Sequence, residues 1–299
     1  MKTEKQQKGG TSPCCVTRQC LLLSPFFLLA FNAGQSQPAF RETPPATIIT
    51  WNIRMNSPGD GVNAWPARKE KVFAFVREIN PQVICMQEVL AEQLEDLTRA
   101  LPQYSWFGAG RDDGKRAGEY VPVFYSKKRY TLLKGDHFWL SETPAVPGKR
   151  GWDAACVRMV TWVCLSDKLS KDTLFVFNTH FDHIGEKARL MSARMLTHAV
   201  DSLCGNKPVI VTGDFNSTDQ DKPYKVITDA GLKDSRAVSF KSPVGPVYTF
   251  TGFAVDGKPG ERIDFLFVRN TKPVQKYIVR EDSSGGYYLS DHLPVMVGF

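Results

Sequence analysis

The most informative stretch of this sequence is Asn178-Thr179-His180-Phe181-Asp182-His183. It contains two of the five histidines of the chain and follows an apolar run that is typical of a buried strand. The pattern has two interpretations. It is either a cluster of metal ligands, with a carboxylate between two imidazoles, or the end of a strand that offers one histidine to a phosphate group. The rest of the chain has to distinguish them.

Hydrophobic patterning on both sides of this stretch predicts sheets covered by helices. Strands are expected at 47–52, 83–86, 104–108, 120–125, 130–140, 154–165, 173–177, 209–211, 262–268, 274–280 and 293–298. Helices are expected at 66–79, 90–100, 186–203 and 221–230. This order suggests two halves, each a sheet with helices on its outer face. The predicted fold is therefore α/β, a four-layer α/β/β/α sandwich of two packed mixed sheets, with 46–299 as one domain.

Residues 1–36 match a secretory signal peptide. A basic region precedes the apolar run Leu21–Phe31, and small and polar residues follow it. The run is too short to cross a bilayer, which takes roughly 17–25 residues, but it fits the apolar core of a signal peptide. We therefore expect export to the periplasm or the medium, cleavage within 33–37, and no stable membrane insertion of the mature protein.

Length and charge narrow the function without fixing it. A chain of 299 residues with 42% hydrophobic content is long enough for a large buried core. Residues 1–36 carry +3 of the formal charge of +7, which leaves +4 for the remainder. That excess is compatible with a polyanionic substrate but too small for a protein that coats nucleic acid. We expect a monomer.

Four cysteines lie beyond the signal peptide, at positions 85, 156, 164 and 204. They form no Cys-x-x-Cys pair, so a structural zinc site is not predicted. Their apolar contexts favour buried thiols. A Cys156–Cys164 disulfide within one predicted hairpin stays open for an exported protein.

Polar residues recur at the ends of the predicted strands, which is where α/β sheets usually carry their sites. They are Asn52, Glu88, His180, Asp214 with Asn216, Asp264, and the pair Asp291-His292. Each alone is typical of a turn or cap. Together they supply hard oxygen ligands for Mg²⁺, neutral donors for a phosphate, and a His–Asp pair that activates or steers water.

These residues belong to blocks that resemble the endonuclease/exonuclease/phosphatase superfamily, which includes pancreatic-type deoxyribonucleases, abasic-site endonucleases, deadenylases, neutral sphingomyelinases and inositol-polyphosphate 5-phosphatases. The resemblance covers nearly the whole chain after residue 46 and implies a deoxyribonuclease-like sandwich. Its blocks follow the family's order: Trp51-Asn52-Ile53, Gln87-Glu88-Val89, Asn178-Thr179-His180, Gly213-Asp214-Phe215-Asn216, Arg262-Ile263-Asp264-Phe265 and Ser290-Asp291-His292.

The resemblance implies a Mg²⁺ or Mn²⁺ cofactor, with Glu88 as the principal ligand and Asn52 and Asp291 near the metal. It also makes His292 the catalytic histidine, oriented by Asp264. The family's mechanisms disagree on whether the His–Asp pair or a separate carboxylate, here Asp214, is the general base.

The resemblance also implies the groups that contact the phosphate. Asn216 and His180 are expected to donate to its oxygens in the transition state. Arg54 matches a phosphate-contacting position of the deoxyribonuclease branch, and Tyr120 lies where the family often places a hydroxyl. Asn178 is counted among the substrate-binding residues.

Four residues carry weaker expectations. Trp152 lies in a basic–aromatic loop, 149–153, that suits stacking on a base or sugar, although a core position fits equally. Arg189, one turn into the long predicted helix, is a candidate for binding an anionic substrate or is simply solvated. Asp182 and His183 either shape the pocket or cap the turn before Gly185.

The sequence therefore favours an exported, metal-dependent phosphoesterase, a phosphodiesterase before a monoesterase, that hydrolyses a phosphate ester by in-line attack of water. The alternatives are a nuclease (a deadenylase-like 3′–5′ exonuclease or an endonuclease), a phosphomonoesterase, and a non-catalytic binding protein on the same fold. A zinc hydrolase of the metallo-β-lactamase type is a further alternative. Its motif, His-x-His-x-Asp-His, differs from the stretch 178–183 only at the first position, which is Asn178 here. It needs more ligand histidines, however, and only His292 lies in a suitable context.

Overall fold

The computed structural model describes residues 46–254, 260–281 and 288–299. The fold described below is that of the unit Thr43–Phe299, which is the second of two along the chain. The predicted signal peptide, 1–36, lies outside the described residues. No helix in the described ranges has the length and apolarity that crossing a membrane requires.

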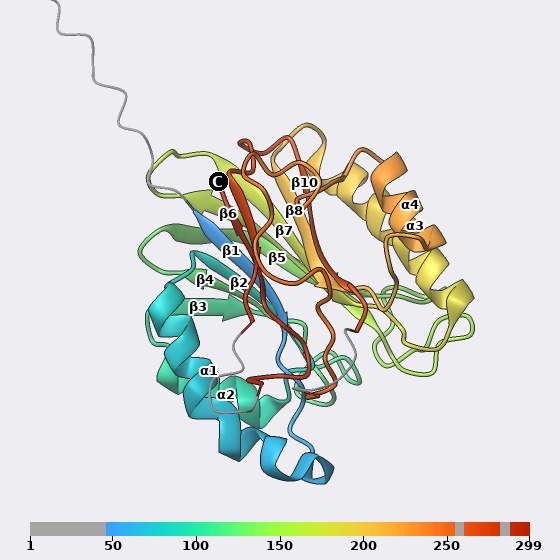
Figure 1. Ribbon diagram of the computed structural model, residues 1–299. Coiled ribbons are helices and arrows are strands. Elements are labelled where there is room, and N and C mark those ends of the chain that lie inside the picture. Colours follow the sequence, from blue (N-terminus) through green and yellow to red (C-terminus); the bar gives the residue numbers. More distant parts are fainter. Residues whose placement is uncertain (1–45, 255–259, 282–287) are drawn as a thin grey trace, which may run out of the picture. The chain divides into compact units, whose positions relative to one another are not determined.

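Two six-stranded sheets form the centre of the second unit (Figure 1). The first sheet has the order β11 (Lys276–Val279), β12 (Val295–Gly298), β1 (Thr47–Asn52), β2 (Val83–Gln87), β4 (Val123–Ser126), β3 (Tyr104–Phe107). The second has the order β5 (Tyr130–Trp139), β6 (Met159–Asp167), β7 (Thr173–His180), β8 (Val209–Asp214), β10 (Asp264–Arg269), β9 (Lys233–Asp234). Both sheets are mixed, because β1–β2 and β7–β8 pair in parallel and their other neighbours are antiparallel.

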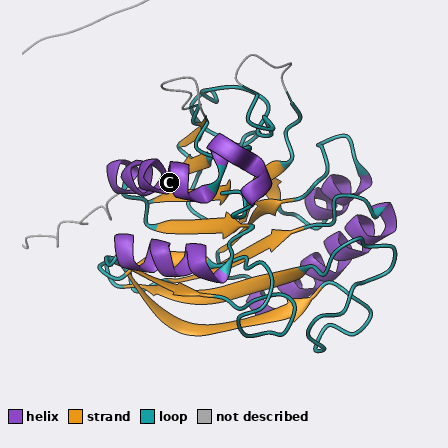
Figure 2. Cartoon of the chain, turned by 90° about the horizontal axis from the view of Figure 1, so that it is seen from below, coloured by secondary structure: helices purple, strands orange, loops and turns teal. Residues whose placement is uncertain are grey.

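Helices cover the outer face of each sheet. α1 (Trp65–Ile79) and α2 (Ala91–Ala100) pack on the first sheet, with Val72, Val76 and Leu97 against its outward side chains. α3 (Glu186–Cys204) and α4 (Lys222–Asp229) cover the second sheet in the same way. Figure 2 shows the strands gathered in two layers. The structure thus confirms the predicted four-layer α/β/β/α sandwich.

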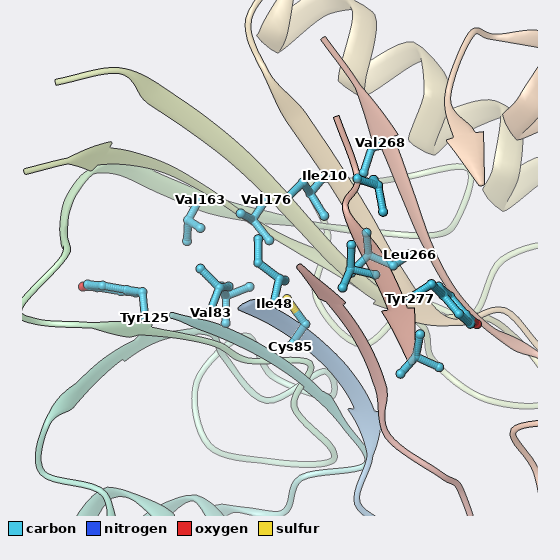
Figure 3. Close-up of a cluster of buried hydrophobic side chains, with 14 of the residues drawn as sticks. Ile48, Val83, Cys85, Tyr125, Val163, Val176, Ile210, Leu266, Val268 and Tyr277 are labelled. Carbon is cyan, nitrogen blue, oxygen red and sulfur yellow. The ribbon is translucent and has the colours of Figure 1, made fainter. Parts of the chain in front are cut away.

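The central core lies between the two sheets and sets the direction of the site residues. Ile48, Val83, Val176 and Ile210 point into it from β1, β2, β7 and β8 (Figure 3). Side chains alternate along a strand, so the residues two and four positions further along β1, β7 and β8 point inward as well. Each of these inward faces changes from apolar to polar toward one end, and the last members are Asn52, His180 and Asp214.

Some predicted boundaries are wrong for identifiable reasons. The expected strand 120–125 is reduced to β4 and an isolated bridge at Tyr120, because Pro122 has no N–H to donate. Residues 154–158 form a loop and β6 begins at Met159, since the Cys156 N–H donates to Asp182 instead of a strand. The 3₁₀ helix η1 (Pro58–Asn63) and β9 were not expected. All four described cysteines are free, so Cys156 and Cys164 form no disulfide.

Candidate active site

The polar ends of the strands meet at one edge of the sandwich. In the second sheet, His180 and Asp264 are the register partners of Asp214 on the two neighbouring strands. β10 begins rather than ends at Asp264, but it runs antiparallel to β8, so its start lies at the same edge. The Asp291-His292 pair precedes β12, which is antiparallel to β1, for the same reason. Strand direction therefore brings residues before and after strands together.

His292 connects the two sheets at this edge. Its Nδ1 lies 2.8 Å from Asp264 Oδ2, and its Nε2 lies 3.6 Å from Asp214 Oδ2. All three side chains are buried. Burial alone lowers the pKa of His292, but the charges of Asp264 and Asp214 raise it well above the usual value. The imidazole is thus held as a cation, with one nitrogen bound to Asp264 and the other directed at Asp214.

Asp214 has the opposite kind of shift. Burial raises its pKa to about 7, and the charge of Asp264 adds to this effect while His292 opposes it. Its Oδ1 accepts from the backbone N–H of Asn216 at 3.0 Å, and its Oδ2 accepts from Asn52 Nδ2 at 3.0 Å. Asn216, at φ 45°, directs its side-chain amide to the Phe181 carbonyl at 2.9 Å. A carboxyl with this pKa can exchange a proton near neutral pH.

Glu88 and Asp291 have the donor set for a hard divalent cation. Both carboxylates are largely buried, and the charge of Glu88 contributes to the raised pKa of Asp291, after burial. The pKa of Glu88 is lowered, because hydrogen bonds from Asn52 and the Met55 N–H and the charges of His292 and Arg54 outweigh burial. Two partly dehydrated, mutually repelling carboxylates fit Mg²⁺ or Mn²⁺. Asn52 is turned the other way: its Nδ2 faces Glu88 and its oxygen accepts from the Arg54 N–H.

The buried trio Asp214, Asp264 and His292 also has ligand atoms within 4.8 Å of one another. We do not assign the metal to it. His292 Nδ1 is bound to Asp264, and a raised pKa keeps the imidazole protonated, whereas a metal ligand must be neutral. The trio therefore suits proton handling, and the Glu88–Asp291 pair is the better fit for a cation.

His180 lies on the other side of Asp214, with Nε2 3.4 Å from Asp214 Oδ2. Burial and the charges of Arg158 and Arg111 lower its pKa well below the usual value, so the ring is neutral. Its Nδ1 lies 3.9 Å from Glu119 Oε2, which Arg158 Nη1 approaches at 3.8 Å. Arg111 Nη2 contacts the other oxygen of that carboxylate, Oε1, at 2.7 Å. A neutral imidazole beside two arginines is suited to donate to an anion.

Sequence reasoning missed Glu119, Arg111 and Arg158. Glu119 stands directly before Tyr120, the residue that the family resemblance indicated. Arg158 interrupts an apolar run at the entry to β6, and it is buried. A charged residue in such a run is a signal for a site, because a buried cation requires partners.

Asn178 and Tyr120 are not placed as expected. Asn178 is fully buried between the sheets, where its amide nitrogen donates to the Met86 and Pro122 carbonyls, so it lies beneath the site and not at its surface. The Tyr120 hydroxyl donates to the Lys115 carbonyl at 2.9 Å, and the residue lines a hollow beside α2. Alternation along the chain explains the second case, since Glu119 and Tyr120 point in opposite directions.

Arg54 lies next to the Glu88–Asp291 pair. Its guanidinium forms two 2.9 Å hydrogen bonds to Asp60 in η1, and lies 3.8 Å from Glu88 Oε2 and 3.9 Å from Asp291 Oδ2. The pKa of Arg54 is raised, chiefly by its hydrogen bond to Asp60. Asp60 was not expected from the sequence, because it lies in the unpredicted 3₁₀ helix.

Trp152 and Arg189 lie beyond the central cluster. Trp152 is half-buried and has a φ of 52°. Its backbone N–H faces both oxygens of the Glu142 carboxylate at 3.2 Å. Arg189 donates to the Asp182 carbonyl at 3.0 Å and lines a hollow between the starts of α3 and α4. Among the described residues, neither side chain forms a hydrogen bond or ion pair with the catalytic cluster.

Asp182 caps the turn that follows β7. Its Oδ1 accepts from the N–H groups of Ile184 and Gly185, and its Oδ2 from that of Cys156. Asp182 also lies close to Cys156 and His183 in a group of three that resembles a metal site. Its oxygens are already occupied by these N–H groups, and Arg158 Nη2 lies 3.4 Å from His183 Nδ1, which disfavours a cation there.

Comparison with known proteins agrees with this geometry. The sequence profile described as Endonuclease/Exonuclease/phosphatase family matches residues 49–292. A Bacteroides vulgatus endonuclease/exonuclease/phosphatase structure is 39% identical, covers 86% of this chain and 98% of its own, and superposes with a TM-score of 0.82. A Bacteroides thetaiotaomicron mannosyl-6-phosphatase is 32% identical, with 84% and 98% coverage and a TM-score of 0.79.

A more distant structure, the human Nocturnin catalytic domain, is 18% identical over 85% of this chain and 94% of its own, with a TM-score of 0.69, and supports the fold alone. The family profile spans the chain from β1 to His292, and the two-sheet fold is shared with the structures above. The chain therefore belongs to the endonuclease/exonuclease/phosphatase family.

Proposed function

We propose that this protein is a divalent-metal-dependent hydrolase of phosphate esters that directs water in line at phosphorus. One observation carries the proposal: a cationic His292, held by Asp264 of the opposite sheet, faces the buried Asp214 at 3.6 Å. The Glu88–Asp291 pair lies beside this arrangement and is linked to it through Asn52. Cation site, proton acceptor and donors to an anion thus converge at one edge.

The residues divide the reaction among them. As the bond from the water oxygen to phosphorus forms and the ester P–O bond breaks, Asp214 accepts the proton of the water. His292 and the neutral His180 donate hydrogen bonds to non-bridging oxygens, where charge develops. A divalent cation held by Glu88 and Asp291 supplies charge neutralisation at the phosphate when bound. The leaving oxygen takes its proton from solvent.

We infer that a phosphomonoester fits this geometry better than the diester that the sequence favours. Arg111 and Arg158 lie on the His180 side, and the buried Nε atoms of both, together with Arg158 Nη1, have no hydrogen-bond partner among the described residues. A terminal phosphate has one more unesterified oxygen and one more negative charge than a diester, so it makes better use of two guanidinium groups. The 32% identical mannosyl-6-phosphatase supports a sugar phosphate as the substrate class.

The test compares p-nitrophenyl phosphate, bis-p-nitrophenyl phosphate, mannose 6-phosphate, RNA and DNA as substrates, with Mg²⁺ and with EDTA. We expect hydrolysis that EDTA abolishes and that favours the monoesters. Glu88→Ala and His292→Ala should both be inactive, whereas His198→Ala, at an exposed histidine on α3, should match the wild type. Full activity of either site variant rejects the assignment, and preferred cleavage of the diester or of nucleic acid restores the alternatives.

Export and the monomeric state remain proposals of their own. The basic and apolar pattern of residues 1–36 supports export. Mass spectrometry of the mature protein should find its N-terminus within 33–37, and an intact N-terminus contradicts cleavage. Light scattering of the purified protein should give the mass of one chain.

A further inference from the structure

A layer of polar side chains lies directly beneath the catalytic residues, between the sheets. Thr50, Asn178 and Thr212 each stand two positions before a site residue, namely Asn52, His180 and Asp214, on the same inward face. Gln87 is the register partner of Asn52 on β2. These four residues, Thr50, Gln87, Asn178 and Thr212, are fully buried and form what we call the polar layer.

Asn178 ties the second sheet to the first through three hydrogen bonds. Its Nδ2 donates to the Met86 carbonyl at 2.8 Å and to the Pro122 carbonyl at 2.9 Å. Its Oδ1 accepts from Gln87 Nε2 at 2.7 Å. Carbonyls only accept, so the Asn178 amide can be oriented in one way, and Gln87 must present its nitrogen. The same nitrogen donates to Thr50 Oγ1 at 3.1 Å.

This arrangement is costly for a protein interior. Gln87 Oε1 is buried and has no partner among the described residues. Leaving a buried acceptor unpaired destabilises a fold, and an apolar side chain of similar volume at this position avoids the penalty. The neighbouring inward positions, Cys85 and Val176, belong to the apolar core. Stability alone therefore gives no reason for a bridging amide at this level.

The positions of Gln87 and Asn178 beside the active site give a reason for the bridging amide. Gln87 immediately precedes Glu88, and Asn178 is two residues before His180, so the shortest hydrogen bond of the layer joins the strand that leads to the cation site to the strand that carries a phosphate donor. We propose that Gln87 and Asn178 are positioning residues that set the spacing between the two sheets at the active site. This inference rests on the proposed function, because the two sheets carry different parts of the same reaction.

The expected consequence concerns turnover and not binding. Glu88 follows β2 and Asp291 precedes β12, two strands of the first sheet, so a small shift between the sheets leaves the cation site whole. The shift does change the distance from the bound phosphate to Asp214 and His180, and a misplacement of about 1 Å can cost roughly 100-fold in rate.

Gln87→Met is the variant of choice, because it removes the bridge and the unpaired Gln87 oxygen but keeps the volume. Asn178 Oδ1 loses the Gln87 donor and keeps the Thr212 hydroxyl at 3.4 Å. Asn178 is less suitable, since its replacement strands two backbone carbonyls. We expect kcat at saturating Mg²⁺ to fall about 10- to 100-fold, with KM and the calorimetric Mg²⁺ affinity within about 3-fold of the wild type and no loss of thermal stability. Thr161→Val is the matched control: Thr161 is the register partner of Asn178 on β6, is fully buried, and has a hydroxyl without a partner in the described chain.

Crystal structures of both variants give a readout that needs no activity. The separation of the Glu88 and His180 Cα atoms should change in Gln87→Met and stay constant in Thr161→Val. The inference is overturned if that separation is unchanged, if kcat of Gln87→Met matches that of the control, or if the loss in kcat merely follows a loss of folded protein or of Mg²⁺ affinity. A wild-type protein without metal-dependent hydrolysis instead refutes the proposed function, and the Cα separation still tests the layer.

Discussion

The two sheets supply different chemistry to one edge. The second sheet contributes His180, Asp214 and Asp264 from the buried ends of regular strands. The first contributes Glu88 and Asp291 from residues just beyond strand ends, and Arg54 beside them has a side chain that is 27% exposed. Burial raises the pKa of Asp214 to about 7, whereas hydrogen bonds and nearby cations keep the pKa of Glu88 low. Proton transfer and cation binding need these opposite environments.

The backbone conformation of the site residues also differs between the two sheets. Arg54 and Glu88 have φ values of 57° and 58°, in the left-handed region that costs a non-glycine residue energy. The second sheet holds its three site residues in ordinary strand geometry, as register partners of one another. Strand pairing holds His180, Asp214 and Asp264 at constant distances from one another. The turns after β1 and β2 instead direct the side chains of Arg54 and Glu88 beyond the edge of the first sheet.

The largest effect is expected where the sheets meet through a charge pair. Asp264→Asn keeps the shape but removes the charge that holds His292 as a cation, so kcat should fall about 10³- to 10⁴-fold and the pKa of His292 should drop. Steady-state kinetics measures the fall in kcat, and NMR titration of the histidines measures the pKa of His292. Asp234→Asn is the control, because Asp234 is buried in an ion pair with Arg262 in the same sheet. Retained turnover in Asp264→Asn removes the pair from the reaction.

The sequence predicted the second sheet's part of this comparison better than the first. Apolar runs ending in His180 and Asp214 indicate both a buried strand and the level at which its polar residues emerge, because the side-chain period is fixed. The first sheet's contribution depends on turns. Asp60 and the orientation of Arg54 follow from a 3₁₀ helix that a Gly/Pro-rich loop does not reveal, so the Arg54–Asp60 pair could not be predicted.

Contacts across the sandwich were equally hidden. Asn178 and Gln87 were quoted as members of motifs, but their pairing at 2.7 Å depends on how one sheet stacks on the other. Glu119 and Tyr120 show the finer limit. The resemblance indicated Tyr120, yet the direction of each side chain depends on an isolated bridge before β4 that the sequence does not reveal. A pattern places residues on faces within one element, and packing decides which faces meet.

A pair of variants separates the roles of the two sheets. His180→Ala should cut turnover about 10²- to 10³-fold, since it removes a donor to the developing charge, yet leave the Mg²⁺ affinity nearly unchanged. Glu88→Gln should instead lose Mg²⁺ affinity, by at least roughly 10-fold, because a ligand charge is gone. Calorimetric titration with Mg²⁺ and steady-state kinetics measure both. Lost metal binding in His180→Ala would place the cation at the histidine stretch 178–183. It would contradict the assignment of the cation to Glu88 and Asp291.

Asp182 tests whether stability can be changed in the second sheet without touching the chemistry. Burial alone raises its pKa, but backbone N–H groups, including those of Gly185 and Cys156, lower it to about 2. A folded pKa below the unfolded value of about 3.9 stabilises the protein above pH 4, and this contribution is lost as the pH falls from about 4 to 2. Asp182→Asn should therefore cost about 2 kcal/mol at pH 7 and less at pH 2.

Urea unfolding at several pH values measures this effect. The variant's stability should depend less on pH between 4 and 2 than that of the wild type, while kcat per folded molecule stays close to normal. An unchanged pH slope would show that the N–H groups around Asp182 do not depend on its charge. A large fall in kcat would place Asp182 in the reaction after all.

The smallest effect is expected at Arg54, on the first sheet. Its guanidinium lies 3.8 Å from Glu88 and 3.9 Å from Asp291, so it repels a cation that approaches the same carboxylates, by about 1 kcal/mol in water-like surroundings. Arg54→Met should then raise the Mg²⁺ affinity of the substrate-free protein several-fold and raise KM, because the same group attracts the phosphate. Arg116→Met is the control, at an exposed arginine paired with Glu95. An unchanged or weaker Mg²⁺ affinity would mean that Arg54 chiefly holds the two carboxylates in place. Arg54 would then position Glu88 and Asp291 by its charge, as His292 lies between the carboxylates of Asp264 and Asp214.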